Sequence, residues 1–270
     1  MNLTEQLARE GLTDLVLNGT SAFALIHGHW EPIELALSAE EVTRLAIELC
    51  DRGGRHLDLA NPFADVSVDG MRVHAVLAAG VSSAPLLSIR KHSARVFAIN
   101  QELQEIVRSK KNFLVSGATG AGKTTMIRSM LAGLQDRVIT IEDVGELSFD
   151  QPNFVSLVAR QANIEGRGEF GVERLFREAL RMRPDRLVLG EVRGAEFGLL
   201  LQALNTGHSG SAATLHANSL TAVPERLIGL GLMAGFSPDT TRALAKTAID
   251  VVIHLEGRQV HVATLGELFE

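Results

Sequence analysis

The segment from Gly117 to Thr124 has the residue types and spacing that bind the phosphates of a nucleotide. It reads Gly-Ala-Thr-Gly-Ala-Gly-Lys-Thr and fits the pattern GxxxxGK[ST]. The apolar run Phe113–Val115 before it predicts a buried strand, and Thr125–Leu131 after it predicts a helix. Glycines let such a loop wrap closely around an anion, so that backbone N–H groups and the positive end of the helix face the β-phosphate. The segment therefore predicts a nucleoside triphosphate site.

Two residues of this loop have assigned roles in the pattern. Lys123 would reach the β- and γ-phosphates, and Thr124 would offer its hydroxyl to Mg²⁺. The residues expected to surround the phosphates are Gly117, Ala118, Thr119, Gly120, Ala121, Gly122, Lys123 and Thr124. No residue that reads the base can be identified, so ATP and GTP both remain open at this point.

An apolar strand ending in Glu191 supplies a first candidate for the hydrolytic base. Arg186–Leu189 is followed by Gly190 and Glu191, and ligands of open α/β sheets bind at this carboxyl edge. Glu191 would orient or deprotonate the attacking water, or hold Mg²⁺ through a water. P-loop enzymes typically place a metal-binding Asp here, so the chain favours the water role over the metal role. A surface ion pair with Arg193 is the structural alternative.

A second strand, Ile139–Ile141, also ends in carboxylates. Glu142 and Asp143 follow it, and metal-assisted phosphoryl transfer needs one acid to fix the ion and another to fix the water. Glu142 therefore rivals Glu191 as the base, and Asp143 joins Thr124 and Glu191 as a candidate for the Mg²⁺ site. The structural alternative is that Glu142 and Asp143 only begin a loop and take no part in the chemistry.

Two histidines flank a strand of small residues in the segment Thr206–Asn218. His208 precedes the apolar run Ala212–Leu215 and His216 follows it. An imidazole could contact the γ-phosphate and relay its presence to neighbouring elements. Each histidine could equally be a hydrogen-bonded structural residue. A zinc site is disfavoured, because no third and fourth ligand stands at useful spacing.

Composition limits the class of protein. The chain has 270 residues, is 46% hydrophobic and carries 26 Lys+Arg against 32 Asp+Glu, a formal net charge of −6. This acidic balance argues against a chain-wide nucleic-acid-binding surface. Cys50 is alone, which excludes a disulfide framework and predicts a packed core thiol. No apolar run approaches a membrane span and the N-terminus lacks a signal-peptide core, so we expect a cytoplasmic protein with peripheral membrane association.

The first 95 residues predict a small α+β domain. Expected strands are Leu12–Asn18, ending in an Asn-Gly turn, Ser21–Ile26, the hairpin Val66–Val68 and Arg72–Val76, and Leu86–Arg90. Ser38 and Glu41 form a candidate capping box for a helix that reaches about Arg52.

Residues 96–270 alternate strands and helices around the loop. Expected strands are Phe113–Val115, Val138–Ile141, Leu187–Leu189 and Ala212–Leu215, with a late hairpin of Val251–Leu255 and Val260–Ala263 around Gly257-Arg258. Expected helices include Gly171–Arg183, ended by Pro184, Ala195–Leu204, and Pro224–Ala234. This order predicts an α/β domain with a mostly parallel, helix-covered sheet.

Together these motifs resemble the secretion-superfamily traffic ATPases, in particular the Tad/Flp-pilus branch of the type II/IV secretion ATPases. The resemblance rests on Asp69–Val73, Ile89–Lys91, Arg160–Gly166, Leu180–Arg186, Gly190–Gly194 and Thr206–His216. It implies a RecA-like P-loop ATPase domain, with a Walker A loop over Gly117–Thr125, so that Thr125 joins the nucleotide site. It further implies an acidic box over Ile141–Glu146, a Walker B segment over Leu187–Glu191 and a histidine box over Thr206–His216.

The resemblance also implies a homo-hexameric ring whose nucleotide lies between the N-terminal domain and the RecA-like domain. Arg72 and Arg90 stand where arginines of the family neutralise γ-phosphate charge, as an arginine finger does. The implied partner is an inner-membrane platform protein. Many members carry a longer helical leader than this chain, and its end at Glu270 is abrupt, so the resemblance does not fix the docking mode.

The motifs predict an Mg²⁺-dependent ATP hydrolase that powers pilus assembly or protein secretion through closure of its two domains. A conjugative DNA-transfer ATPase and a nucleotide-gated ring scaffold with little turnover are the alternatives. Neither the transported substrate nor the direction of work, extension, retraction or secretion, follows from the sequence.

Overall fold

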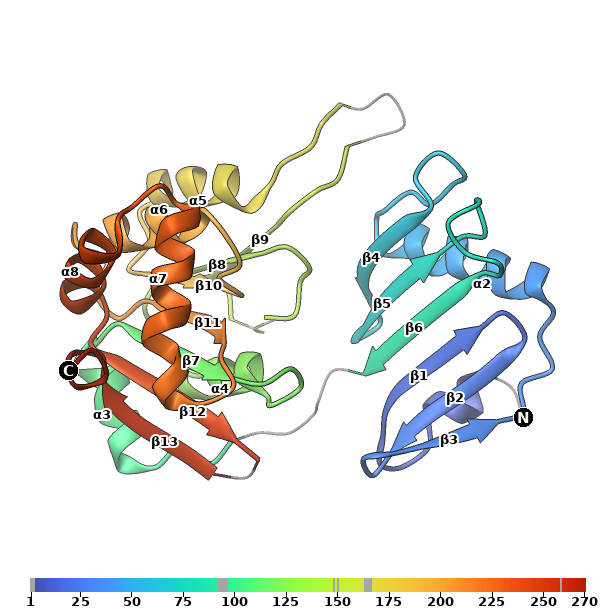
Figure 1. Ribbon diagram of the computed structural model, residues 1–270, viewed down its shortest axis with the longest axis horizontal. Coiled ribbons are helices and arrows are strands. Elements are labelled where there is room, and N and C mark those ends of the chain that lie inside the picture. Colours follow the sequence, from blue (N-terminus) through green and yellow to red (C-terminus); the bar gives the residue numbers. More distant parts are fainter. Residues whose placement is uncertain (1–2, 92–96, 148, 150, 163–166, 258) are drawn as a thin grey trace. The chain divides into compact units, whose positions relative to one another are not determined.

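The chain divides into two compact units (Figure 1). The computed structural model describes residues 3–91, 97–147, 149, 151–162, 167–257 and 259–270. The N-terminal unit comprises Met1–Ala94 and Arg160–Glu169, and the C-terminal unit comprises Arg95–Ala159 and Phe170–Glu270. The expected domain ranges, 1–95 and 96–270, stay a prediction. Residues 163–166 of the motif Arg160–Gly166, and Arg258 of the expected late turn, lie outside the described residues.

The N-terminal unit is built on a six-stranded antiparallel sheet of order β3-β2-β1-β6-β5-β4. Its elements are α1 (Leu3–Leu7), β1 (Leu12–Asn18), β2 (Ser21–Ile26), β3 (His29–Ile33), α2 (Ala39–Arg52), β4 (Phe63–Val68), β5 (Met71–Val76) and β6 (Leu86–Lys91). The predicted hairpins are present, and the capping box of Ser38 and Glu41 is formed at the start of α2. The edge strand β3 was not predicted, because Pro32 interrupts its pattern.

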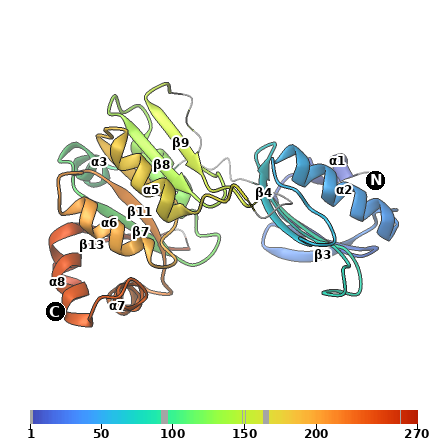
Figure 2. The same ribbon diagram turned by 90° about the horizontal axis from the view of Figure 1, so that it is seen from above.

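Helices α1 and α2 lie on the same face of this sheet (Figure 2). Alternate residues of the strands point toward them, among them Leu15 of β1 and Val73 of β5, and meet Val42 and Ala46 of α2. Cys50 lies in this core with no exposed surface, and burial raises the pKa of its thiol to about 11. The predicted packed core thiol is therefore confirmed.

The C-terminal unit is built on a seven-stranded sheet of order β13-β12-β7-β11-β10-β8-β9. Every neighbouring pair is parallel except the edge pair β12 and β13. The strands are β7 (Phe113–Gly117), β8 (Val138–Glu142), β9 (Phe154–Val158), β10 (Arg186–Leu189), β11 (Ala212–His216), β12 (Val251–Glu256) and β13 (Gln259–Thr264). The mostly parallel sheet is thus confirmed, although β9 was not predicted.

Helices cover both faces of this sheet. They are α3 (Gln101–Arg108), α4 (Lys123–Leu131), α5 (Val172–Arg181), α6 (Glu196–Leu204), α7 (Val223–Met233), α8 (Pro238–Ala248) and α9 (Leu265–Leu268), with a short 3₁₀ turn, η1 (Leu220–Ala222). Helix α5 ends before the predicted Arg183, because Arg183 adopts a left-handed φ of 56° ahead of Pro184. The helices α3 and α8 were not predicted.

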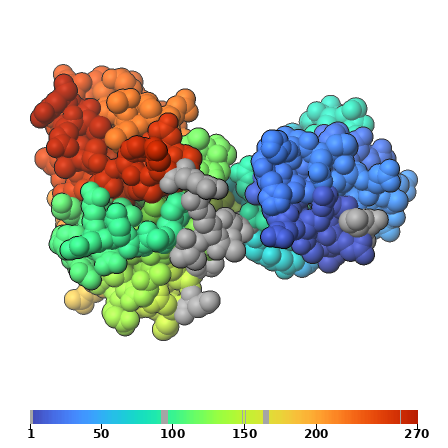
Figure 3. Space-filling view, turned by 90° about the horizontal axis from the view of Figure 1, so that it is seen from below, coloured from blue at the N-terminus to red at the C-terminus, as the bar shows by residue number. Residues whose placement is uncertain are grey.

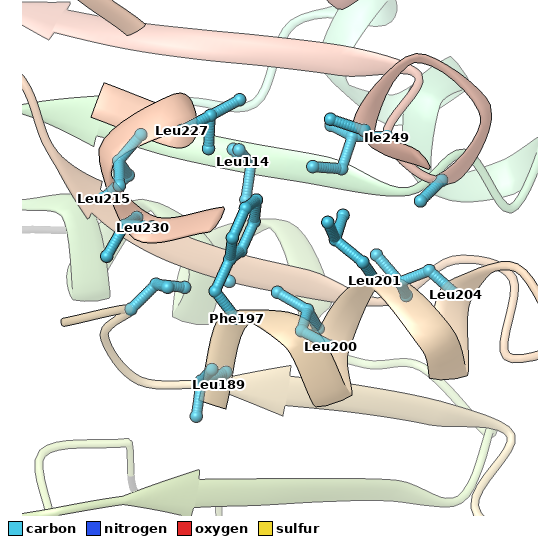
Figure 4. Packing of buried hydrophobic residues seen from close by; sticks show 14 of the residues in the cluster. Leu114, Leu189, Phe197, Leu200, Leu201, Leu204, Leu215, Leu227, Leu230 and Ile249 are labelled. Atoms are coloured by element: carbon cyan, nitrogen blue, oxygen red, sulfur yellow. The ribbon is translucent and has the colours of Figure 1, made fainter. Parts of the chain in front are cut away.

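Two apolar clusters separate the layers. On one face Val115 of β7 and Ile253 of β12 pack with Met126 and Ile127 of α4 and with α3. Figure 3 shows the segment of α3 beside the C-terminal segment on the surface of this unit. On the other face lies a larger cluster formed with α5, α6, α7 and α8, in which Phe197 points from α6 toward Leu114 of β7 (Figure 4). None of the helices in the described part of the chain is long and apolar enough to cross a membrane.

A buried polar network holds the amino edge of this sheet. Arg186, only 2% exposed, donates to the carboxylate of Asp136 and to the carbonyls of Val107 and Gly210. Gly210 must lack a side chain, because a Cβ there would overlap the guanidinium of Arg186. One arginine thereby joins the start of β10, the end of α3 and the loops that precede β8 and β11.

Replacing Arg186 with leucine should destabilise the protein strongly. The substitution leaves Asp136 and two carbonyls without their shared donor, and loss of one partner of a buried ion pair costs about 3–5 kcal/mol. Urea unfolding measures the change in the free energy of unfolding. Arg181→Leu, which removes an exposed arginine, is the control and should cost about 0.5 kcal/mol or less. Equal effects of the two substitutions would contradict this account of the network.

Candidate functional site

The parallel register brings the predicted loop and two other chain segments to one edge of the sheet. Gly117, the last residue of β7, pairs with His216 of β11 on one side and with Leu255 of β12 on the other. Because the strands run in the same direction, their carboxyl ends meet where ligands of such sheets bind. Glu191 follows β10 at this same edge.

The loop after β7 depends on glycine at three positions. Gly117, Gly120 and Gly122 adopt φ values of 148°, 77° and 93°. Gly122 caps the start of α4 in a left-handed conformation, and a Cβ at this position would lie 3.1 Å from the ring of Phe97. A Cβ at Gly117 would lie 2.7 Å from the carbonyl oxygen of Leu255. The loop is therefore pressed between β12 and the segment that precedes α3.

Lys123 is buried at the start of α4 and folds back onto the loop. Its Nζ donates to the carbonyls of Gly117 (2.9 Å) and Ala118 (2.8 Å), and Nδ1 of His216 lies 3.4 Å away. Burial lowers the pKa of Lys123, and the carboxylates of Glu191 and Glu146 oppose this change. The ammonium group thus sits inside the loop, where it can exchange these carbonyls for phosphate oxygens.

His216 links Lys123 to Glu191. Its Nε2 lies 2.8 Å from Oε1 of Glu191, on the opposite side of the ring from Lys123. Burial lowers the pKa of His216, the charge of Lys123 lowers it further, and Glu191 opposes both effects. The structure therefore joins Lys123 to the candidate base Glu191 through one imidazole.

Glu191 is held on its other side by Arg193. The guanidinium Nε lies 2.6 Å from Oε2 of Glu191, and a second nitrogen of the same group lies 2.5 Å away. The predicted structural alternative, an ion pair between these two residues, is thus present as well. Arg193 also lies 3.9 Å from the carboxylate of Asp143, so it stands between acids that follow two different strands.

Glu142 has a different environment, which argues for a structural role. It is 4% exposed, and its carboxylate accepts the backbone N–H groups of Glu146 and Leu147. Burial raises the pKa of Glu142 from 4.5 to about 7, although these hydrogen bonds oppose the change. Both its oxygens thus accept backbone N–H groups of the turn after β8, which is the role of a residue that holds the turn.

Glu146 was not singled out from the sequence, although it lies inside the expected acidic segment. Its Oε2 is 3.4 Å from the hydroxyl of Thr124, the expected Mg²⁺ ligand. Glu142 fixes the backbone N–H of Glu146, so one acid positions the other. The sequence signal for Glu146 was its position four residues after Glu142. Only the geometry of the turn brings its side chain to α4.

The oxygen donors near α4 fit a magnesium ion. Thr124 and Glu146 offer a hydroxyl and a carboxylate oxygen, which are the hard donors that Mg²⁺ prefers, and Asp143 lies on the same turn. No group of three or more His, Cys, Asp or Glu side chains arranged for a metal occurs among the described residues. Mg²⁺ usually takes only one or two carboxylates and completes its shell with water and phosphate oxygens, so this sparse set matches an ion that arrives with the nucleotide.

The structure does not bring His208 to this edge. His208 lies before the amino end of β11, where its Nδ1 contacts the carbonyl of Ala203 and its own carbonyl accepts the hydroxyl of Ser211. The two histidines of the segment are therefore at opposite ends of one strand. Within a single chain, the hydrogen bonds of His208 are those of a structural residue.

The two predicted arginine fingers belong to the N-terminal unit. Arg72 of β5 and Arg90 of β6 are cross-strand neighbours and lie on the same face of the sheet. Each has an acidic partner: Asp65 binds Arg72 through two hydrogen bonds, and Asp14 binds Arg90 at 2.8 Å. The two arginines and their two aspartates thus form a charge-balanced cluster on this sheet.

The stability of the protein should depend on pH through Glu142. Its raised pKa means that the folded state holds a proton that the unfolded chain has released between about pH 4.5 and 7, so stability falls as pH rises through this window. Glu142→Gln should remove this dependence, which amounts to about 1.4 kcal/mol for each pKa unit. Urea unfolding at several pH values measures it. Glu105→Gln, an exposed change on α3, is the control, and parallel curves for wild type and Glu142→Gln would refute the assignment.

The comparisons with known proteins identify the family. The family described as "Type II/IV secretion system protein" matches residues 73–259. A "Putative conjugal transfer protein" of Mycobacterium tuberculosis is 38% identical over 97% of this chain and 81% of its own length.

Two solved structures share the fold. The pilus retraction motor PilT with bound ADP has a TM-score of 0.69 and is 21% identical, covering 97% of this chain and 82% of that one. The VirB11 ATPase of the Brucella suis type IV secretion system, in complex with sulphate, has a TM-score of 0.53 and is 23% identical, covering 98% and 93%. They confirm the predicted α/β, RecA-like fold. The chain therefore belongs to the type II/IV secretion system protein family, as its motifs predict.

Proposed function

We propose that the protein is an Mg²⁺-dependent ATPase that powers a type IV pilus or secretion machine of the Tad/Flp kind. The observation that carries this proposal is the contact series from Lys123 through His216 to Glu191 at the mouth of the loop. It couples the group that would hold the phosphates to the group that would handle the water. The residues Gly117–Thr125 are the proposed nucleotide site.

Binding would begin at the backbone of the loop and at the amino end of α4. Lys123 would leave the carbonyls of Gly117 and Ala118 and donate to the β- and γ-phosphates, while the hydroxyl of Thr124 and the carboxylate of Glu146 face the metal side. Mg²⁺ held there would neutralise negative charge on the phosphates. His216 would then exchange its contact with Lys123 for one that reports the γ-phosphate.

Hydrolysis requires Glu191 to be free of Arg193. Two guanidinium nitrogens contact Oε2 of Glu191 at 2.5–2.6 Å and Nε2 of His216 contacts Oε1 at 2.8 Å, so neither oxygen is open to an attacking water. Movement of Arg193 toward Asp143 would release Glu191 to orient and deprotonate the water. Glu142 remains the rival base by its raised pKa, but its engaged oxygens favour the role of holding Glu146.

The mechanical cycle follows from the two units. Arg72 and Arg90 would neutralise the γ-phosphate in a homo-hexamer, so that ATP draws an N-terminal unit toward a nucleotide site and hydrolysis releases it. The motion would be delivered to an inner-membrane platform protein from the cytoplasmic face of that membrane. The net charge of −6 agrees with a protein partner rather than direct contact with nucleic acid.

Substitutions at the site separate binding from turnover. Lys123→Ala should abolish nucleotide binding, whereas Glu191→Gln should bind Mg²⁺-ATP normally and lose about 10²-fold to 10⁴-fold in turnover. A fluorescent ATP analogue measures binding and phosphate release measures turnover. If Glu191→Gln kept near-wild-type turnover while Glu142→Gln or Glu146→Gln lost it, the base would be misassigned. Wild-type protein that binds ATP with negligible turnover, unaffected by assembly, would instead identify a nucleotide-gated scaffold.

A conjugative DNA-transfer ATPase is the second candidate, favoured by the described conjugal role of the Mycobacterium tuberculosis relative. This function predicts ATPase stimulation by DNA and binding that weakens steeply with salt, because each neutralised phosphate releases counterions. Turnover measured with and without single- and double-stranded DNA, between 50 and 200 mM salt (about the range over which such binding is lost), tests it. For the proposed pilus or secretion motor we expect no stimulation, and stimulation would replace that proposal with the conjugative one.

A further inference from the structure

A buried polar pair lies directly beneath the phosphate-binding loop and is not used by the proposed mechanism. Oγ of Ser116 and Nδ1 of His254 are 2.9 Å apart, and the two residues are 0% and 2% exposed. His254 interrupts the otherwise apolar run Val251–Leu255 of β12. A polar pair in such a strand is costly unless both members are satisfied, so its place next to the loop calls for a reason.

The pair sits at the point where the loop begins. Ser116 immediately precedes Gly117, and the parallel register of β7 and β12 sets His254 opposite Ser116 and Leu255 opposite Gly117. The carbonyl of Leu255 is so close to Gly117 that no side chain fits there. The hydrogen bond therefore fixes β12 against β7 at the residue where the backbone leaves the strand.

Gly117 is also one of the two residues whose carbonyls hold the ammonium of Lys123. The carbonyl of Gly117 accepts from Nζ of Lys123 at 2.9 Å, so a shift of Gly117 moves an acceptor of the phosphate-binding lysine. We propose that His254 is a positioning residue for nucleotide binding: through Ser116 it holds Gly117, and with it the loop, in the conformation that receives the phosphates. This inference rests on the proposed nucleotide site.

The electrostatic surroundings keep His254 suited to this role. Burial lowers the pKa of His254, and the nearby charges are Glu256 on its own strand, His261 on β13 and Lys123 on α4. Glu256 opposes the change, whereas His261 and Lys123 reinforce it. An uncharged imidazole can share a hydrogen bond with the hydroxyl of Ser116 without adding a second cation beneath Lys123.

Substitutions of the pair test the proposal through nucleotide affinity. His254→Leu leaves Ser116 without its partner and should raise the Kd for a fluorescent ATP analogue with Mg²⁺ about tenfold, with a parallel rise in KM and little change in kcat. His254→Asn keeps an amide near the position of Nδ1 and should restore most of the affinity. Ser116→Ala should weaken binding similarly, and the double variant His254→Leu/Ser116→Ala should be no weaker than His254→Leu alone.

A matched control and a stability measurement make the result decisive. His261→Leu changes the histidine that pairs with His254 across the hairpin but lies on the edge strand away from the loop, and it should leave Kd within about twofold. If His254→Leu and His254→Asn lower the thermal midpoint of the nucleotide-free protein but bind nucleotide like wild type, the inference is overturned. Failure of wild-type protein to bind the nucleotide would overturn the proposed function itself, which is a different outcome.

Discussion

The parallel pairing of β7 with β11 and β12 is the constraint on which the rest of the site depends. It places Gly117, His216 and Leu255 at one level of the sheet, although they come from distant parts of the sequence. Neither the strand nor the loop alone would bring the imidazole of His216 to Lys123. Because side chains alternate along a strand, a slip of one residue between β7 and β11 would turn His216 to the opposite face and break the link to Glu191.

The amino edge of the sheet contributes to stability, and the carboxyl edge holds the candidate site. At the amino edge, Arg186 donates to one carboxylate and two carbonyls and so joins segments that precede the strands. At the carboxyl edge, charges are paired in ways that a ligand can replace: Lys123 with carbonyls and Glu191 with Arg193. The amino edge thus supports a carboxyl edge whose contacts can be exchanged. This arrangement is expected of a site that binds and releases a ligand.

Much of this organisation could be predicted from the sequence, and the failures have physical reasons. The loop from Gly117 to Thr124 was recognisable because its chemistry is local: glycines, lysine and hydroxyl act within one turn of chain. Glu142 and Glu191 were identified as candidates because each lies at the end of an apolar strand. The contrast between Glu142 and Glu146 could not be predicted, because it depends on which side chain the turn after β8 folds inward and which it presents to α4.

Other features could not be predicted from the sequence for similar reasons. His208 and His216 were expected on either side of one strand, but the sequence does not show that His208 contacts the carbonyl of Ala203 while only His216 reaches Lys123 and Glu191. The edge strands β3 and β9 lack the strong alternation of buried strands, so periodicity does not reveal them. The pair of Ser116 and His254 joins residues 138 positions apart and has no local signal at all.

The place of β12 beside β7 also has a consequence for biosynthesis. The strand that opens the loop is made early, yet the strand that packs against Gly117 follows it by more than a hundred residues. While the chain is still leaving the ribosome, β7 has an open side and the loop lacks the carbonyl against which it rests. The loop therefore cannot adopt this conformation before β12 has emerged, and non-local pairing of this kind makes folding slow. A ligand that binds only the closed loop would stabilise those molecules in which β12 has paired with β7.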